Sequence, residues 1–113
     1  MSPMCMYSCE NGVANDFHLL HYGSRAQGGI GLIIVEATGV VPEGRITNKC
    51  MGIWNDDQAD ALSKIVKFVH ENSASKIGIQ LAHAGRKAST WHGKQIPLEE
   101  GWETIAPSPI PFH

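Results

Sequence analysis

Polar and titratable side chains stand where two apolar segments of the sequence end. Glu36 and Ala37 follow one such segment, and Gln80, His83 and Arg86 follow the other. An amide both donates and accepts hydrogen bonds, and a planar guanidinium suits acidic groups. These residue types could bind a polar ligand. A buried Gln80 would require such a ligand or a hydrogen-bonded network, because an unpaired buried polar group costs about 1–3 kcal/mol.

The cysteines and the helical histidines give little indication of a metal site. Cys5 and Cys9 lie four residues apart with no second pair downstream, which is a weak signal for zinc. His18 and His21 lie three residues apart, and no carboxylate completes an evident ligand set. We therefore expect no metal. We also expect free thiols, because 3 cysteines are an odd number and nothing else indicates a secreted disulfide scaffold.

Two segments have apolar residues at helical spacing. The first covers residues 16–27, with Asp16 as the expected N-cap. The second covers residues 56–72, with Asp56 or Asp57 in the capping position. Both are expected to be amphipathic helices.

Each expected helix is followed by an apolar segment. Residues 31–37 form a β-branched run bounded by glycine, which is typical of a strand buried on both faces, and residues 76–81 form a shorter strand. Residues 38–55 read as a long loop, and 89–113 as an irregular excursion rich in proline and glycine. The alternation predicts an α/β fold with parallel strands, whose carboxyl ends carry the ligand site. Residues 2–7 would point to that same face if they end a further strand.

Composition excludes several classes of function. The chain has 113 residues, 42% hydrophobic residues and a formal charge of −2, which fits one small domain. Without a basic run it lacks the electrostatic footprint of a protein that binds nucleic acid or an anionic membrane. The apolar run 30–35 is far shorter than the roughly 20 residues that span a bilayer. No Lys or Arg precedes an apolar region at the start, so we expect a cytoplasmic protein.

Several ordered motifs point to one family. They occupy residues 2–8, 31–37, 44–45, 52–54, 80–87 and 106–108. Together they resemble the Old Yellow Enzyme family of flavin-dependent ene-reductases, also described as NADH:flavin oxidoreductases. The pattern of Cys5 and Tyr7 is closest to the thermophilic-like subclass usually called NADPH dehydrogenase.

The resemblance implies a (β/α)₈ barrel, which takes about 250 residues. The 113 residues would then hold only part of a barrel. They would supply the end of the first strand, the second and third βα units and a following irregular loop, as the N-terminal portion of a single FMN-binding domain. Because 30–35 carries no charged residue that would blunt an open edge, the expected partner is the remainder of the barrel or a further copy of the chain.

The resemblance also assigns roles to residues. It implies that Ala37 offers its backbone N–H to a flavin carbonyl oxygen and that Gln80 contacts the pyrimidine edge of the flavin. The Cys5 thiol would lie beside the flavin and tune its redox potential. His83 and Arg86 would have supporting roles. The residues implied to line the FMN site are Ser2, Pro3, Met4, Cys5, Ala37 and Gln80.

Tyr7 would place its hydroxyl in the substrate pocket of this subclass. Each residue also has a plainer interpretation. Cys5 could be a small buried hydrophobic residue, and Tyr7 a half-buried aromatic anchor. Arg86 could pair with Glu36 and join two strand ends.

The implied activity is a two-step relay in which NADPH or NADH reduces FMN, and an alkene conjugated to a carbonyl or nitro group is then reduced. The family's paired substrate-binding histidines lie in later parts of the barrel. This chain would therefore hold only part of the flavin site. The alternatives are a non-catalytic flavin-binding or interaction fragment, inactive in isolation, and a remnant without function.

Overall fold

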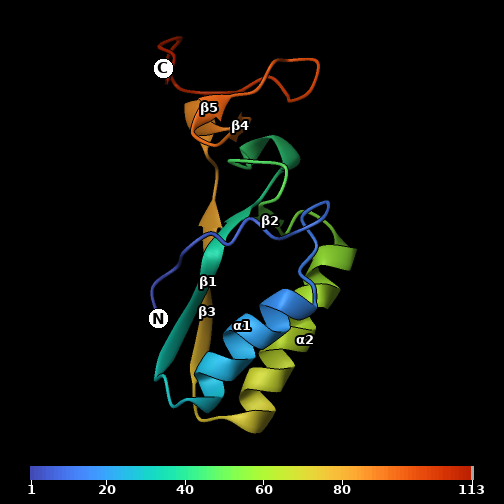
Figure 1. Cartoon of the computed structure of the whole chain (residues 1–113), viewed down its shortest axis with the longest axis vertical. Helices are drawn as coiled ribbons and strands as arrows, with labels where there is room; N and C mark the ends of the chain where they lie inside the picture. The colour runs from blue at the N-terminus through green and yellow to red at the C-terminus, as the bar shows by residue number, and fades with distance from the viewer. Residues whose placement is uncertain (113) are drawn as a thin grey trace.

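The sheet is centred on one buried strand. The structure is a computed structural model that describes residues 1–112. Strand β1 (Leu32–Gly39) pairs in parallel with β2 (Met51–Gly52) on one side and with β3 (Lys76–Ala82) on the other. Helices α1 (Asp16–Gln27) and α2 (Asp56–Asn72) lie together on one side of this sheet (Figure 1). The parallel α/β arrangement confirms the predicted fold class.

Both helices have the bounds that their periodicity predicts, but the expected N-caps are wrong. Asn15 caps α1, with its side chain accepting the Phe17 N–H at 3.0 Å. Asn55 caps α2 by accepting the Gln58 N–H at 3.0 Å. The aspartates that follow lie in the first helical turn, where their charge favours the helix dipole without capping it.

The core lies between the two helices and β1. Its largest members are fully enclosed: Tyr22, Ile33, Met51 and Val69 are at most 1% exposed. The backbone of Met1 runs beside β1, where Met1 O accepts the Ile34 N–H at 3.1 Å. The expected open edge at 30–35 is therefore wrong, because this segment leads into the central strand of the sheet.

The open edge of the sheet belongs to β3. Most β3 residues are exposed, and β1 is its one neighbour among the strands of the described chain. The expectation that Gln80 is buried is wrong for this reason. Burial of a strand depends on what packs over it: β1 contributes Ile33 and Val35 to the core, whereas β3 contributes only the partly buried Ile77.

Two expected irregular regions contain short elements. The loop 38–55 includes the end of β1, a 3₁₀ turn η1 (Pro42–Gly44) and β2. After the 3₁₀ turn η2 (Gly85–Lys87), strands β4 (Thr90–Trp91) and β5 (Lys94–Gln95) form an antiparallel hairpin. Its two turn residues, His92 and Gly93, both have positive φ, as a tight hairpin with the right twist requires. The rest of the chain to residue 112 is irregular, and His113 lies outside the described part.

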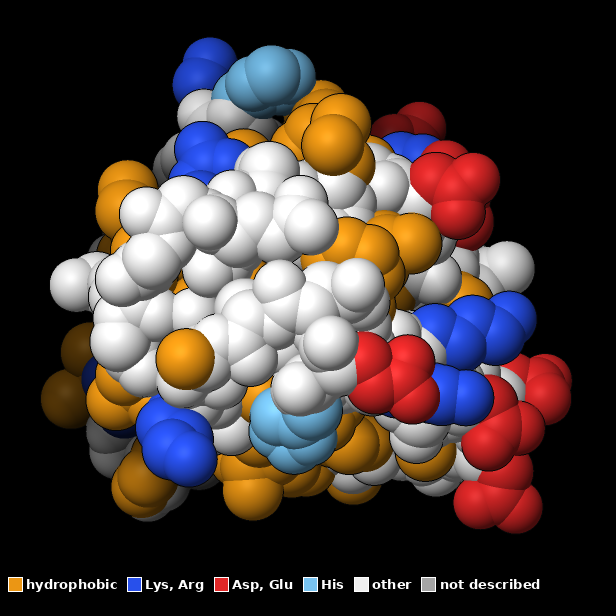
Figure 2. All heavy atoms as spheres, turned by 90° about the horizontal axis from the view of Figure 1, so that it is seen from below, with side chains coloured by type: hydrophobic (Ala, Val, Ile, Leu, Met, Phe, Trp, Pro, Cys, Tyr) orange, Lys and Arg blue, Asp and Glu red, His pale blue; other side chains and the backbone are white. Residues whose placement is uncertain are grey.

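Neither helix in residues 1–112 is long and apolar enough to cross a membrane. The face at the lower end of the molecule in Figure 1, where β1 and β3 begin, carries interspersed charges of both signs (Figure 2).

Candidate functional site

A β-bulge shapes the carboxyl end of β1. Val35 pairs with Ile79 and Thr38 with Leu81, so Glu36 and Ala37 together lie opposite Gln80 alone. A bulge of this kind locally disrupts the ladder and re-aims backbone and side-chain groups, and bulges are common beside active sites. It places Ala37 and Gln80 across from each other on neighbouring strands.

The N-terminal segment brings two more predicted residues to this bulge. The Cys5 thiol lies near the Ala37 backbone N–H and the Tyr7 hydroxyl. Burial raises the pKa of Cys5 above its usual value, and the nearby Cys50 and Glu36 raise it further. Cys5 therefore carries its proton at neutral pH. It is only half-buried, and full burial belongs to Cys9 and Cys50.

Tyr7 lies at the rim of this group with a 40% exposed side chain. Its φ of +50° is in the left-handed region, which a bulky non-glycine residue rarely adopts. Burial, followed by the neighbouring Cys5, raises the pKa of Tyr7. Its hydroxyl therefore stays protonated at neutral pH and can donate a hydrogen bond.

A buried network fixes the segment that carries Cys5 and Tyr7. Glu36 is 1% exposed, and its carboxyl accepts the Tyr22 hydroxyl at 2.5 Å and the Met6 N–H at 3.1 Å. The Tyr22 oxygen in turn accepts the Glu36 N–H at 3.1 Å. Burial and this contact raise the pKa of Tyr22. Helix α1, strand β1 and the N-terminal segment are thus joined directly behind the bulge.

The remaining predicted cofactor residues flank this group. Ser2, Pro3 and Met4 lie in the extended segment that leads from Met1 to Cys5. Ser2 and Met4 are exposed, and Pro3 is half-buried. The side chain of Gln80 is exposed on β3 and makes no hydrogen bond within the described chain.

His83 and Arg86 follow β3 but point to different places. His83 Nδ1 accepts the Gly85 N–H at 3.0 Å, so the neutral ring carries its proton on Nε2. The His83 ring lies beside Gly44 at a cavity of about 60 Å³ that Ala37 and Cys50 also line. Its position thus adjoins the bulge.

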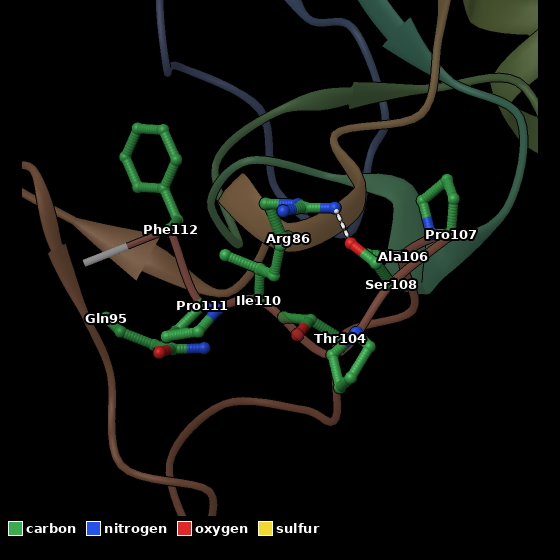
Figure 3. A pocket seen from close by; sticks show the side chains of 10 residues that line it. Arg86, Gln95, Thr104, Ala106, Pro107, Ser108, Ile110, Pro111 and Phe112 are labelled. Carbon is green, nitrogen blue, oxygen red and sulfur yellow. Dashed lines mark hydrogen bonds between the residues drawn. The ribbon is translucent and has the colours of Figure 1, made fainter.

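The proposed pairing of Arg86 with Glu36 is wrong. Arg86 Nη2 donates to Ser108 Oγ at 2.8 Å, and both residues line a cavity of about 520 Å³ formed with the C-terminal tail (Figure 3). The Glu36 carboxyl instead has its partners in α1 and the N-terminal segment, where Tyr22 and the Met6 N–H donate to it.

The contact between Cys9 and His18 is structural. Cys9 Sγ lies 3.4 Å from His18 Nε2, and both residues are fully buried. His18 Nδ1 accepts the Asn15 N–H at 3.1 Å, so Nε2 carries the proton and donates to sulfur. Burial raises the pKa of Cys9 to about 12, which removes thiolate chemistry. Residues 1–112 contain no group of three or more His, Cys, Asp or Glu that could hold a metal ion.

Sequence reasoning gave no role to four residues beside the site. Cys50 and Arg45 line the small cavity with Ala37, and the Arg45 guanidinium lies over the rings of both Trp54 and Trp102. Arg45 and Trp54 belong to the motifs at residues 44–45 and 52–54, which are recognisable in the sequence. The position of Trp102 in the sequence gives no signal that the C-terminal tail packs against them.

The comparisons with known proteins identify the class. Residues 1–105 match the NADH:flavin oxidoreductase / NADH oxidase family. The chain is 53% identical over 115 aligned residues to an NADPH dehydrogenase of Bacillus cytotoxicus, covering 100% of this chain and 30% of that protein. The chain therefore belongs to the NADH:flavin oxidoreductase family.

Solved structures agree with this assignment. Morphinone reductase superposes with a TM-score of 0.79 at 30% identity, over 98% of this chain and 28% of its own. An Old Yellow Enzyme from Pichia sp. AKU4542 gives 0.74 at 34% identity, over 79% and 23% respectively. The chain thus corresponds to part of a TIM barrel and spans less than a third of the relatives it matches. Its family comprises NADPH dehydrogenases and flavin oxidoreductases.

The residues at the bulge suit a flavin. Ala37 has a small side chain and a backbone N–H beside the half-buried Cys5, and the exposed Gln80 amide opposite is free to both donate and accept. A flavin ring offers carbonyl oxygens and an N–H at its pyrimidine edge, which match these groups.

Proposed function

We propose that residues 1–113 form the N-terminal portion of one FMN-binding barrel domain, which acts as an ene-reductase with NADPH or NADH as reductant. The bulge that sets Ala37 opposite Gln80, with the Cys5 thiol near the Ala37 backbone N–H, carries this proposal. When bound, FMN supplies the hydride chemistry that reduces the activated C=C bond of an α,β-unsaturated carbonyl or nitro compound.

This chain's residues bind and orient the flavin. The Ala37 N–H and the Gln80 amide would contact its polar edge, while Ser2, Pro3, Met4 and Cys5 line the ring. Because its raised pKa keeps Cys5 a neutral thiol, its sulfur places a polarizable dipole beside the ring rather than a negative charge. A neutral thiol destabilises an anionic reduced flavin less than a negatively charged thiolate would.

Tyr7 would hold the substrate. Its protonated hydroxyl at the rim can donate to the carbonyl or nitro oxygen on which negative charge develops. The left-handed backbone at Tyr7 is a local strain of the kind that clusters at functional sites. This chain thus supplies one donor to the oxygen, and we assign the others to the remainder of the barrel.

The remainder of the barrel is also the partner we propose. A largely apolar groove of about 620 Å³ lies between α2 and β3, lined by residues such as Leu62, Val66 and Ile79. It adjoins the open edge of β3. Since the relatives are more than three times as long, their next helix and parallel strand would cover this groove and pair with this edge. The three free cysteines fit a reducing compartment, so we also propose a cytoplasmic location.

Titration of the purified chain with FMN tests the proposed site. We expect saturable quenching or shifting of the flavin spectrum, weakened about tenfold or more by Gln80→Ala, because an amide that reads a ligand contributes about 1–3 kcal/mol. Gln27→Ala, at the exposed end of α1, is the matched control and should bind FMN as the parent chain does. A folded chain that binds no FMN, or binds it equally with Gln80→Ala, would contradict the proposal.

A further inference from the structure

The Arg45 guanidinium lies over two indole rings. Its central carbon lies 5.2 Å from the ring centroid of Trp54 and 5.0 Å from that of Trp102. Arg45 Nε also donates to Pro42 O at 2.8 Å. Within residues 1–112 no carboxylate forms a salt bridge with Arg45. The cation is therefore held by aromatic faces and a carbonyl, which suits a planar guanidinium better than a compact ammonium group.

One of these rings belongs to the tail. We call residues 89–105 the strap, which includes the β4–β5 hairpin and Trp102. The strap is fastened to the loop around Arg45 at several points. Trp102 Nε1 donates to Glu43 O at 2.9 Å, and the Thr90 N–H donates to Ile46 O at 2.8 Å. Within the strap, Ser89 Oγ accepts the Trp102 N–H at 3.0 Å. In Figure 1 the hairpin lies just beyond the carboxyl ends of β1 and β3.

The other end of the Arg45 side chain reaches the flavin-facing strand. A Cβ added to Gly39 would lie 3.2 Å from Arg45 Cγ, so the alkyl chain packs directly on β1. Arg45 also lines the cavity of about 60 Å³ together with Ala37 and Cys50. The same side chain therefore contacts the strap through its guanidinium and the end of β1 through its alkyl chain.

We propose that Arg45 is a positioning residue that couples docking of the strap to flavin binding at the bulge. Because Arg45 forms part of the cavity wall beside Ala37 while Trp102 holds its guanidinium, release of the strap frees the Arg45 side chain and loosens that wall. By thermodynamic linkage, the two effects are reciprocal. If a docked strap raises the affinity for flavin by some factor, then a flavin bound at Ala37 raises the equilibrium constant for docking of the strap by the same factor. This inference rests on the proposed flavin site.

Two substitutions separate this coupling from simple structure. Arg45→Met keeps the alkyl length and removes the cation, whereas Trp102→Ala removes one indole without altering any residue that lines the cavity. Arg25→Met, on the exposed side of α1, is the matched control, since within residues 1–112 Arg25 donates only to His21 O. Circular dichroism establishes that each variant is folded.

Two readouts follow the strap and one follows the flavin. Arg45→Met should shift tryptophan emission to the red and increase acrylamide quenching, measured in a Trp91→Phe background so that Trp54 and Trp102 report. Tryptic cleavage after Lys94 in the strap should become about tenfold faster, and FMN affinity should fall by a similar factor, within the 5–150-fold range of typical couplings. Arg45→Lys should restore part of both effects. Trp102→Ala should reproduce the loss of FMN affinity.

The outcomes distinguish a failure of the coupling from a failure of the proposed flavin site. Saturating FMN should slow cleavage after Lys94 in the parent chain by the factor that Arg45→Met costs in affinity. A strap that is freed while FMN affinity is unchanged would overturn the coupling, and so would a strap that stays docked in Arg45→Met. If the folded parent chain binds no FMN, the proposed function fails and the coupling fails with it, while the emission and cleavage data still decide whether Arg45 clamps the strap.

Discussion

The two long strands of this chain have similar apolar sequences but very different surroundings. β1 lies between two neighbours, contributes the buried Ile33 and Val35 to the core, and carries the buried Glu36 network at its end. β3 has one neighbour in the sheet and is largely exposed. The part of the candidate site on β1 is thus held in place by contacts within this chain. The part on β3 is Gln80, whose side chain is exposed and has no hydrogen-bond partner in the described chain.

The largest expected difference between β1 and β3 is in how much a truncated side chain destabilises the fold. Ile33→Ala in β1 should lower the free energy of unfolding by about 3–4 kcal/mol, because a fully buried aliphatic side chain leaves a cavity. Ile79→Ala in β3 removes the same atoms from a side chain that is 36% exposed and should cost about 1 kcal/mol. Urea unfolding of both variants measures the difference. Equal losses would mean that β3 is as well packed as β1.

The network behind the bulge should give the next largest effect. Tyr22→Phe deprives the Glu36 carboxyl of a donor and the Glu36 N–H of an acceptor, so we expect a loss of about 3 kcal/mol in unfolding free energy. Tyr7→Phe, at the exposed rim, should stay within about 0.5 kcal/mol of the parent chain. If Tyr22→Phe is equally mild, the network does not hold the N-terminal segment.

The buried end of α1 should also make stability depend on pH. Burial lowers the pKa of His18, and that of His21, below the usual 6.5, so the unfolded chain binds protons more readily than the folded one. Stability should therefore be complete above pH 6.5 and fall as the pH drops below it, by at most about 1.4 kcal/mol per pH unit for each histidine.

Chemical denaturation between pH 7.5 and 5.5 measures this slope. His18→Gln should flatten it, while His70→Gln, exposed on α2, should leave it in place. A slope that persists unchanged in His18→Gln would assign the effect to other groups.

The smallest effect concerns the helix caps. Asn15→Ala should destabilise the chain by about 1 kcal/mol, because it removes the acceptor for the first-turn N–H. Asp16→Ala should cost about 0.3–0.5 kcal/mol, since it removes only a favourable charge near the helix dipole. Thermal unfolding of the two variants compares them, and the reverse order would restore Asp16 as the cap.

Regular patterns predicted the regular elements. The bounds of α1 and α2 follow from apolar spacing over three or more turns, and β1 follows from a β-branched run. The caps were displaced by one residue because asparagine and aspartate cap equally well, and the direction in which the chain enters the helix selects Asn15 and Asn55. The two-residue strands β2, β4 and β5 are too short to show a period.

The site was predictable as a set of residues but not as a geometry. Strand ends and motifs pointed to Cys5, Ala37 and Gln80, which the structure brings to one bulge. The bulge itself depends on the pairing between β1 and β3 and leaves no local signal. The exposure of Gln80 and the partner of Arg86 depend on segments packed from elsewhere, and so does the stack of Trp102 on Arg45.

The most direct test of the central claim is an ¹⁵N NMR titration of the chain with FMN, followed at each backbone amide. If the end of β1 already forms half of a flavin site, the largest shifts should fall on Cys5, Ala37 and Gln80, with smaller ones along the strap. Shifts confined to the groove between α2 and β3 or to the tail cavity at Arg86, or no shifts from a folded chain, would contradict the claim.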